Sequence, residues 1–206
     1  YVCMAKGSPL LPKLIGCYER ELHEAIRLIQ ARNRFDVVLD VGCAEGYYVA
    51  GFAKLFGGVE CYAYDIDPNA RRLCSELARL NDMANRVHVR SEITAPELIS
   101  RCAGRRALII SDCEGYEVNL FTAEVLPTLS LCDIICELHV GFEGDRVMHI
   151  PAMLEATHDV QIIRPAPMKK EEMPPIKGLT RGECLYAYHP ARGSEDAWMV
   201  ALSKRP

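Results

Sequence analysis

Short apolar runs alternate with amphipathic segments along most of the chain. The apolar runs predict five strands, at residues 37–42, 59–67, 86–92, 107–115 and 132–139. Helical periodicity lies between them, at residues 47–56, 68–81, 95–103 and 118–129, the last one continuing as far as Pro127. Strands without polar alternation are typical of a parallel sheet that is covered on both faces. Five strands that alternate with helices therefore predict a doubly wound α/β fold.

The two ends of the chain depart from this rhythm. Residues 17–31 carry an apolar stripe at helical spacing and predict an amphipathic helix before the first strand. After residue 139 the pattern predicts a helix at 147–157, a strand at 159–165 and a closing strand at 197–203. We therefore expect a Rossmann-like sheet of about seven strands, mostly parallel, with its last strand antiparallel.

The composition narrows the class of protein. Half of the 206 residues are hydrophobic, a quarter are charged, and the net charge is −4, which argues against a face that binds nucleic acid. The ten cysteines lie mostly in apolar runs and form no C-x-x-C pair, so they read as small buried hydrophobes. We find neither a signal peptide nor an apolar stretch of membrane length. We expect a cytoplasmic protein that binds neither nucleic acid nor membrane.

The segment PAPMKKEEMPPIKG, at residues 165–178, is proline-rich and charged. It could be a surface loop, or it could be a lid over the edge of the sheet where ligands bind. Long loops in compact domains are often functional, so both interpretations stay open.

The first strand ends in DVGCAEG, residues 40–46. Ligands of doubly wound sheets bind at the carboxyl ends of the strands. A dinucleotide fingerprint would place glycines at positions 42, 44 and 47, but this chain has Ala44 and the bulky Tyr47. No Gly-Lys-Ser/Thr sequence follows, so a Walker phosphate-binding loop is also excluded. NAD is therefore a poorer fit than a ligand without a pyrophosphate.

Several segments resemble one enzyme family. DVGCAEG resembles motif I of the class I S-adenosylmethionine (SAM)-dependent methyltransferases. SDCEGYE, at 111–117, is similar to the D-V-E-G-x-E signature of the FkbM-type methyltransferases, and CELH, at 136–139, to the E-x-H that ends their next strand. The resemblance covers about residues 36–140, with a weaker match at 197–203. Cys113 replaces a usual aliphatic residue, and YDIDP replaces the more common F-E-P-N-P.

The resemblance implies one methyltransferase domain over residues 1–206. Residues 1–35 would form an N-terminal helical cap, in which Tyr18 and Glu19 could fold over the cofactor, although packing is the simpler role. Residues 36–140 would bind the cofactor. Residues 141–206 would supply a substrate-side helix, the proline-rich lid and the closing strands.

SAM is the cofactor that the resemblance implies. The residues expected to bind it are Asp40, Gly42, Cys43, Ala44, Gly46, Asp65, Ile66, Ser91, Glu92 and Asp112. Asp40 would help to hold the amino end, and Asp65 would accept from both ribose hydroxyls. The two glycines would let the backbone run alongside the methionine and ribose groups. We therefore expect a bulky residue at Gly46 to block the cofactor channel more than it unfolds the domain.

Two pairs of ionisable residues end neighbouring strands, Asp112 with Glu114 and Glu137 with His139. Spacing by two sends each pair to one side of its strand, so the four groups should converge. His139 is the best candidate for the base that deprotonates an acceptor, although a surface histidine is the simpler alternative. Asp112 could position the acceptor or face the sulfonium, and Glu114 could start the next helix.

Three carboxylates and an imidazole also suit a hard divalent cation. The Asp-Asn pair of the metal-assisted methyltransferases is not evident in this sequence, so a metal is not favoured and no residue is assigned to one.

FkbM-type enzymes are mostly O-methyltransferases of sugars, polyketides and other small hydroxylated molecules. The resemblance thus implies O-methylation of a small molecule, which would be the main partner, with a homodimer left open. A methyltransferase acting on RNA or protein is the first alternative. An NAD-dependent oxidoreductase and a SAM-binding module without activity are weaker ones.

Overall fold

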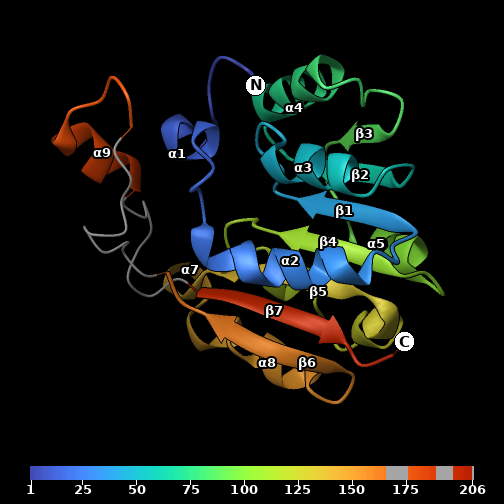
Figure 1. The fold of residues 1–206 in the computed structure, drawn as a ribbon. Coiled ribbons are helices and arrows are strands. Elements are labelled where there is room, and N and C mark those ends of the chain that lie inside the picture. Colours follow the sequence, from blue (N-terminus) through green and yellow to red (C-terminus); the bar gives the residue numbers. More distant parts are fainter. Residues whose placement is uncertain (166–175, 189–196, 206) are drawn as a thin grey trace.

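The computed structural model describes residues 1–165, 176–188 and 197–205. The described part of the chain forms one seven-stranded sheet with helices on both faces (Figure 1). Most of the segment predicted as a loop or lid, 165–178, lies outside the described residues. None of the described helices is long and apolar enough to cross a membrane.

The strand order across the sheet is β3-β2-β1-β4-β5-β7-β6. The strands are β1 (Val37–Val41), β2 (Glu60–Tyr64), β3 (Val87–Arg90), β4 (Ala107–Ser111), β5 (Asp133–Leu138), β6 (His158–Ile163) and β7 (Ala197–Ser203). The first five pair in parallel, and β7 runs antiparallel between β5 and β6. The predicted Rossmann-like sheet with an antiparallel last strand is confirmed.

The helices are shorter and more numerous than the sequence pattern predicts. The α-helices are α1 (Leu10–Leu14), α2 (His23–Arg32), α3 (Tyr47–Leu55), α4 (Pro68–Leu80), α5 (Ala95–Cys102), α6 (Glu117–Leu120), α7 (Val140–Glu143), α8 (His149–Leu154) and α9 (Arg181–Tyr188). The 3-10 helices are η1 (Arg20–Leu22), η2 (Leu126–Leu131) and η3 (Gly144–Arg146).

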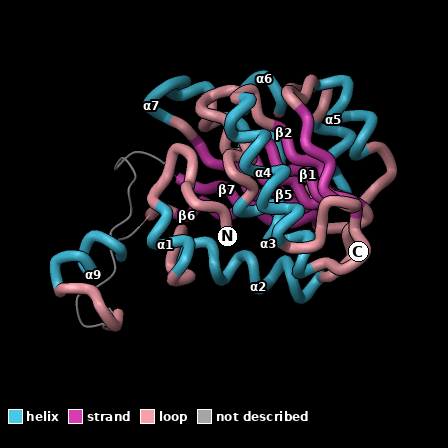
Figure 2. Tube along the Cα trace, turned by 90° about the horizontal axis from the view of Figure 1, so that it is seen from above, coloured by secondary structure: helices cyan, strands magenta, loops and turns pink. Residues whose placement is uncertain are grey.

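Two hydrophobic clusters fill the space on either side of the sheet. One joins the strands to α2, α3 and α4, and the other joins them to α5, α6, η2 and α8. Seen from above, the strands lie between these two layers of helices (Figure 2). Trp198 is fully buried, and so are Cys61, Cys132 and Cys136, as the apolar runs around them predicted.

Two predicted helices differ in the structure. The helix expected over 118–129 is divided into α6 and η2, because the backbone of Phe121 leaves the helical region (φ −92°, ψ 59°). Pro127 lies in the first turn of η2, the place in a helix that tolerates proline best, so it begins a turn where the prediction had it end one. The helix expected from residue 17 begins at His23, after the left-handed backbone of Glu19 and one 3-10 turn.

The strand register brings the segments that follow β1, β4 and β5 to one edge of the sheet. Val41 pairs with Ser111, and Ser111 pairs with Cys136 on the next strand. The residues that follow these three therefore leave the sheet side by side. This is the edge at which the sequence predicted a ligand.

The glycines of the turn after β1 make room for other parts of the protein. Gly42 has φ +80°, and a Cβ atom there would lie 1.7 Å from the carbonyl oxygen of Asp112. Gly46 has φ +93°, and a Cβ atom there would lie 2.8 Å from Sγ of Cys74 in α4. Both positions require glycine because of a left-handed backbone and a close neighbour. The nearest atoms at both positions belong to the protein itself, and Gly42 also lines the cavity described below.

Replacing Gly46 by leucine should therefore destabilise the fold, which reverses the expectation from the sequence. We expect the free energy of unfolding to fall by on the order of 1–3 kcal/mol. Leucine would have to adopt the left-handed backbone conformation of Gly46, and its side chain would collide with Cys74 in α4. Urea unfolding of Gly46→Leu measures this. Gly51→Ala is a matched control, since a Cβ atom at that position in α3 meets no atom within 4 Å. Unchanged stability together with lost cofactor binding would restore the original expectation.

Candidate active site

A cavity of about 680 Å³ lies at the carboxyl ends of β1 to β5. Its wall contains nearly all of the residues that the sequence singled out, namely Asp40, Gly42, Cys43, Ala44, Asp65, Ile66, Ser91, Glu92, Asp112, Glu114, Glu137 and His139. Gly46 is the exception, because it faces α4. The cavity therefore gathers residues from five strand ends.

Asp40 connects β1 to the helix that follows it. Its side chain is buried and Oδ2 accepts a hydrogen bond of 2.9 Å from the backbone N–H of Val49 in α3. Burial raises the pKa of Asp40 from its ordinary 3.8 to about 7, although this hydrogen bond acts in the opposite direction. Asp40 thus holds the turn in place and also forms part of the cavity wall.

Asp65 connects two loops at the end of β2. Its Oδ2 accepts from the backbone N–H of Ala44 at 2.9 Å, and its Oδ1 accepts from the N–H of Asp67 at 2.8 Å. The next residue, Ile66, is 81% exposed, an unusual place for a large apolar side chain, and it lies in the cavity wall. An acid beside an apolar face is the arrangement that suits a ribose and its base.

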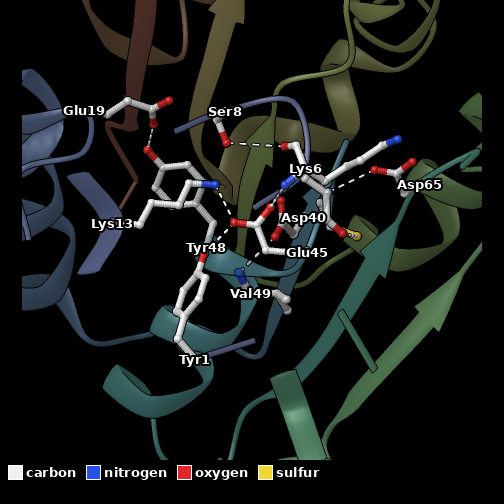
Figure 3. A network of polar contacts seen from close by, with 12 residues as sticks. Tyr1, Lys6, Ser8, Lys13, Glu19, Asp40, Glu45, Tyr48, Val49 and Asp65 are labelled. Carbon is white, nitrogen blue, oxygen red and sulfur yellow. Dashed lines mark hydrogen bonds and ion pairs between the residues drawn. The ribbon is translucent and has the colours of Figure 1, made fainter. Parts of the chain in front are cut away.

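Glu45 fastens the N-terminal segment over the turn (Figure 3). Its side chain is fully buried, and it accepts from Lys13 Nζ at 2.5 Å, from the backbone N–H of Lys6 at 2.9 Å and from the hydroxyl of Tyr1. Burial alone would raise the pKa of Glu45, but the ammonium of Lys13 and these hydrogen bonds lower it. A charged Glu45 thus holds a segment more than thirty residues away in sequence.

The sequence did not reveal this role. An acid between the two glycines of the turn was visible, but its partners lie far away along the chain and no spacing rule connects them.

The same N-terminal segment supplies aromatic and charged groups to the cavity. Lys13 Nζ lies over the rings of Tyr18 and Tyr47, 4.6 and 5.2 Å from their centres. Glu19 accepts a hydrogen bond from the hydroxyl of Tyr48. Tyr18 and Glu19 therefore both pack and line the cavity, where packing alone was the simpler expectation.

His139 lies where the two acidic strand ends meet. Its Nε2 is 3.4 Å from Asp112 Oδ1, 3.6 Å from Glu137 Oε2 and 3.7 Å from Glu114 Oε2. His139 and Glu137 are buried, whereas the side chain of Glu114 is 74% exposed. The structure thus brings together the four groups of the two predicted pairs and leaves His139 inside the molecule, not at its surface.

A fourth carboxylate was missed. Glu117, the first residue of α6, is fully buried, and its Oε1 lies 3.1 Å from Nδ1 of His139. A signal was available, since Glu117 is the last acid of the SDCEGYE segment. No expectation was attached to it because it follows the strand by several residues and reaches His139 only through the folded turn.

These carboxylates set the charge of the imidazole. Burial alone would lower the pKa of His139. The hydrogen bond to Glu117 and the charges of Glu117 and Asp112 outweigh burial, so the pKa of His139 is raised above its ordinary 6.5. The surrounding carboxylates therefore stabilise the imidazolium form relative to that of a histidine in water.

The donor atoms also meet the requirements of a divalent cation in part. One donor atom each from Asp112, Glu114 and His139 lies within 4.8 Å of the others. Two carboxylates and one imidazole would suit a hard cation such as magnesium or calcium, with water in its remaining positions. In that case His139 would be a neutral ligand, and the cation would supply the positive charge that the carboxylates otherwise draw from the imidazolium.

Several solved structures share this fold. The O-methyltransferase from Bacillus cereus, in complex with SAH, has a TM-score of 0.58 and 13% identity, over 95% of this chain and 82% of that chain. TomG, an O-methyltransferase from Streptomyces achromogenes involved in tomaymycin synthesis, has a TM-score of 0.60 and 11% identity, over 96% and 91%. A protein from Clostridium thermocellum assigned as an rRNA methylase has a TM-score of 0.56 and 12% identity, over 89% and 95%.

No protein-family model and no curated protein matches the chain. At these low identities the structural likeness establishes the fold alone. The chain has the Rossmann-like fold that these methyltransferases share.

The raised pKa of Asp40 predicts a fall in stability with rising pH. The folded protein keeps this proton up to about pH 7, whereas the unfolded chain releases it near its ordinary pKa of 3.8. The folded state thus binds more protons in this window, and the free energy of unfolding must decrease as pH rises through it. Between about pH 5 and about pH 8 this contribution amounts to roughly 2–3 kcal/mol.

Denaturant unfolding of Asp40→Asn against pH tests this expectation, because asparagine can still accept from Val49. The decrease should be smaller in this variant by the amount given above. Asp36→Asn is the control, since that carboxylate is exposed at the opposite end of β1. Parallel profiles for the wild type and Asp40→Asn would show that Asp40 is ionised in the folded protein.

Proposed function

We propose that this chain is a SAM-dependent methyltransferase that methylates a hydroxyl group of a small molecule. The observation that carries the proposal is that one cavity contains both Asp65, an acid beside the exposed apolar side chain of Ile66, and His139, a buried histidine among carboxylates. The fold supports it, because ligands of doubly wound sheets bind at this edge.

The adenosine part of the cofactor would lie along the ends of β2 and β3. The carboxylate of Asp65 would accept from the ribose hydroxyls, and Ile66 would cover one face of the adenine ring. Ser91 and Glu92 are exposed at the same end of the cavity and would lie near the adenine amine. The amino end would lie near Asp40, in the turn that Glu45 and the N-terminal segment cover.

The acceptor would lie between this site and His139. SAM supplies a methyl group on a positively charged sulfur, and the transfer is an in-line displacement. As the acceptor oxygen bonded to the methyl carbon and the carbon–sulfur bond broke, Nε2 of His139 would accept the hydroxyl proton. Asp112 would orient the acceptor, and Glu137 would stabilise the imidazolium that results.

A small acceptor is favoured over a macromolecule by what surrounds the cavity. Residues of the N-terminal segment, Tyr18 and Glu19 among them, and Tyr188 of α9 form part of its wall. The net charge of −4 is unfavourable for RNA. A macromolecular acceptor stays the second candidate, because the assigned rRNA methylase shares the fold.

Asp65→Ala should weaken SAM binding by roughly 1.5–3 kcal/mol, the range for a hydrogen bond to a charged group. Isothermal titration calorimetry with SAM, its demethylated product and NAD measures this and also tests the oxidoreductase alternative. Asp65→Asn separates the contribution of the negative charge from that of the hydrogen bond to the turn, since asparagine can still accept from the N–H of Ala44 but carries no charge. Asp159→Ala, at an exposed position of β6, serves as the control. Unchanged affinity in a folded Asp65→Ala protein would remove the ribose assignment.

His139→Ala should leave SAM affinity nearly intact and lower turnover by about 10²–10⁴, the usual contribution of a positioned base. In the wild type, turnover should rise with pH as the imidazole loses its proton, with a midpoint above 6.5 because the pKa is raised. That limb should vanish in the variant. Product analysis with pools of hydroxylated acceptors provides the assay.

The same assay with a chelator tests the metal alternative. A required cation predicts activity that is lost in chelator, restored by magnesium or calcium, and as sensitive to Asp112 and Glu137 as to His139. Full activity in chelator and in His139→Ala would exclude both roles and leave positioning alone to promote transfer.

A further inference from the structure

Glu117 occupies an unusual place for a charged residue. It is the first residue of α6 and is fully buried. It lies neither at the end of a strand, as Asp112 and Glu137 do, nor at the surface, where a charged side chain is usually found. Its Oε1 accepts from the backbone N–H of Cys113 at 3.0 Å and lies 3.1 Å from Nδ1 of His139. One oxygen atom therefore contacts both the turn after β4 and His139, the residue that follows β5.

The second oxygen supports a role beyond holding the turn. Oε2 of Glu117 is buried and has no hydrogen-bond partner among the described residues. A buried carboxylate with one unsatisfied oxygen is costly, and a neutral residue could serve as the acceptor for Cys113 at lower cost. The negative charge is thus needed for something other than the backbone.

The contact with His139 provides that reason. An ionised carboxylate only accepts hydrogen bonds, so Nδ1 must carry a hydrogen to bind it. A neutral imidazole has a single N–H group, so Nε2 is then left with its lone pair. Nε2 is also the atom that faces the acids of the cavity, 3.4 Å from Asp112.

We propose that Glu117 is the positioning residue of this site, which fixes the Nδ1–H tautomer of His139 and thereby directs the basic Nε2 into the cavity. Glu117 is not among the residues that line the cavity, and it acts through the histidine, as the carboxylate does in other pairs of this kind. The inference rests on the proposed function for its effect on turnover, but its structural part does not need the reaction.

Nitrogen NMR of ¹⁵N-histidine-labelled protein tests the structural part directly. At a pH above the pKa of His139, the wild type should show this histidine with hydrogen on Nδ1, and His139→Ala identifies its signals. In Glu117→Leu, which has an apolar side chain without a hydrogen-bond acceptor, the Nδ1–H pattern should be lost. A wild-type histidine with its hydrogen on Nε2 would overturn the proposal, whether or not an acceptor has been found.

Turnover in a double-mutant cycle tests the functional part. Glu117→Leu should lower kcat by about 10²–10⁴, and adding His139→Ala should lower it little further, because both changes disable one unit. KM for SAM should stay within about twofold in each variant if only the acceptor side is affected. Losses that multiply would show that Glu117 acts independently of His139 and would overturn the positioning role.

Two further variants keep the test valid if Glu117→Leu folds poorly. Glu117→Gln retains the shape and an acceptor for Cys113 and removes only the charge, and we expect kcat to fall by about tenfold or more with the fold preserved. Glu124→Gln makes the same substitution at an exposed site and should leave kcat unchanged. A wild-type protein that binds no SAM would end the proposed function, while the tautomer measurement would still decide the role of Glu117.

Discussion

The carbonyl oxygen of Asp112 lies where a side chain on residue 42 would begin, only 1.7 Å from the position of its Cβ atom. This contact between the ends of β1 and β4 controls the geometry of the whole edge. β4 is paired in register with β5, so the two strand ends carry Asp112 and His139 to the same place. Any residue other than Gly42 would push the turn away from β4 and separate the two halves of the cavity.

Two buried carboxylates then complete the site from different directions. Glu45 holds Lys13 and the N-terminal segment over the turn, and Glu117 holds His139 from behind. A buried charge is tolerated only when a partner compensates it, so each pair is strong only as long as water is excluded. The closure of the cavity and the orientation of the histidine therefore depend on the same physical condition, which the packed helices and the N-terminal segment provide.

The strand pattern was sufficient to predict which residues meet at the edge. Apolar runs without alternation require a covered parallel sheet, and a parallel sheet places all of its carboxyl ends together. Asp40, Asp65 and His139 could therefore be assigned to one cavity from their positions after strands. The prediction was wrong for the helix over 118–129, because the sequence pattern did not reveal that the backbone leaves the helical region at Phe121.

By itself, the sequence determined the fold class and the strand ends, because periodicity and the parallel arrangement depend on local backbone geometry. Only the tertiary structure decided which side chains neutralise one another. Glu45 reaches Lys13 across 32 positions, and Glu117 reaches His139 across 22. No local rule links residues so far apart, since such pairs form only when packing has removed both partners from water. The charge and tautomer of the histidine, and with them the chemistry of the site, follow from that packing.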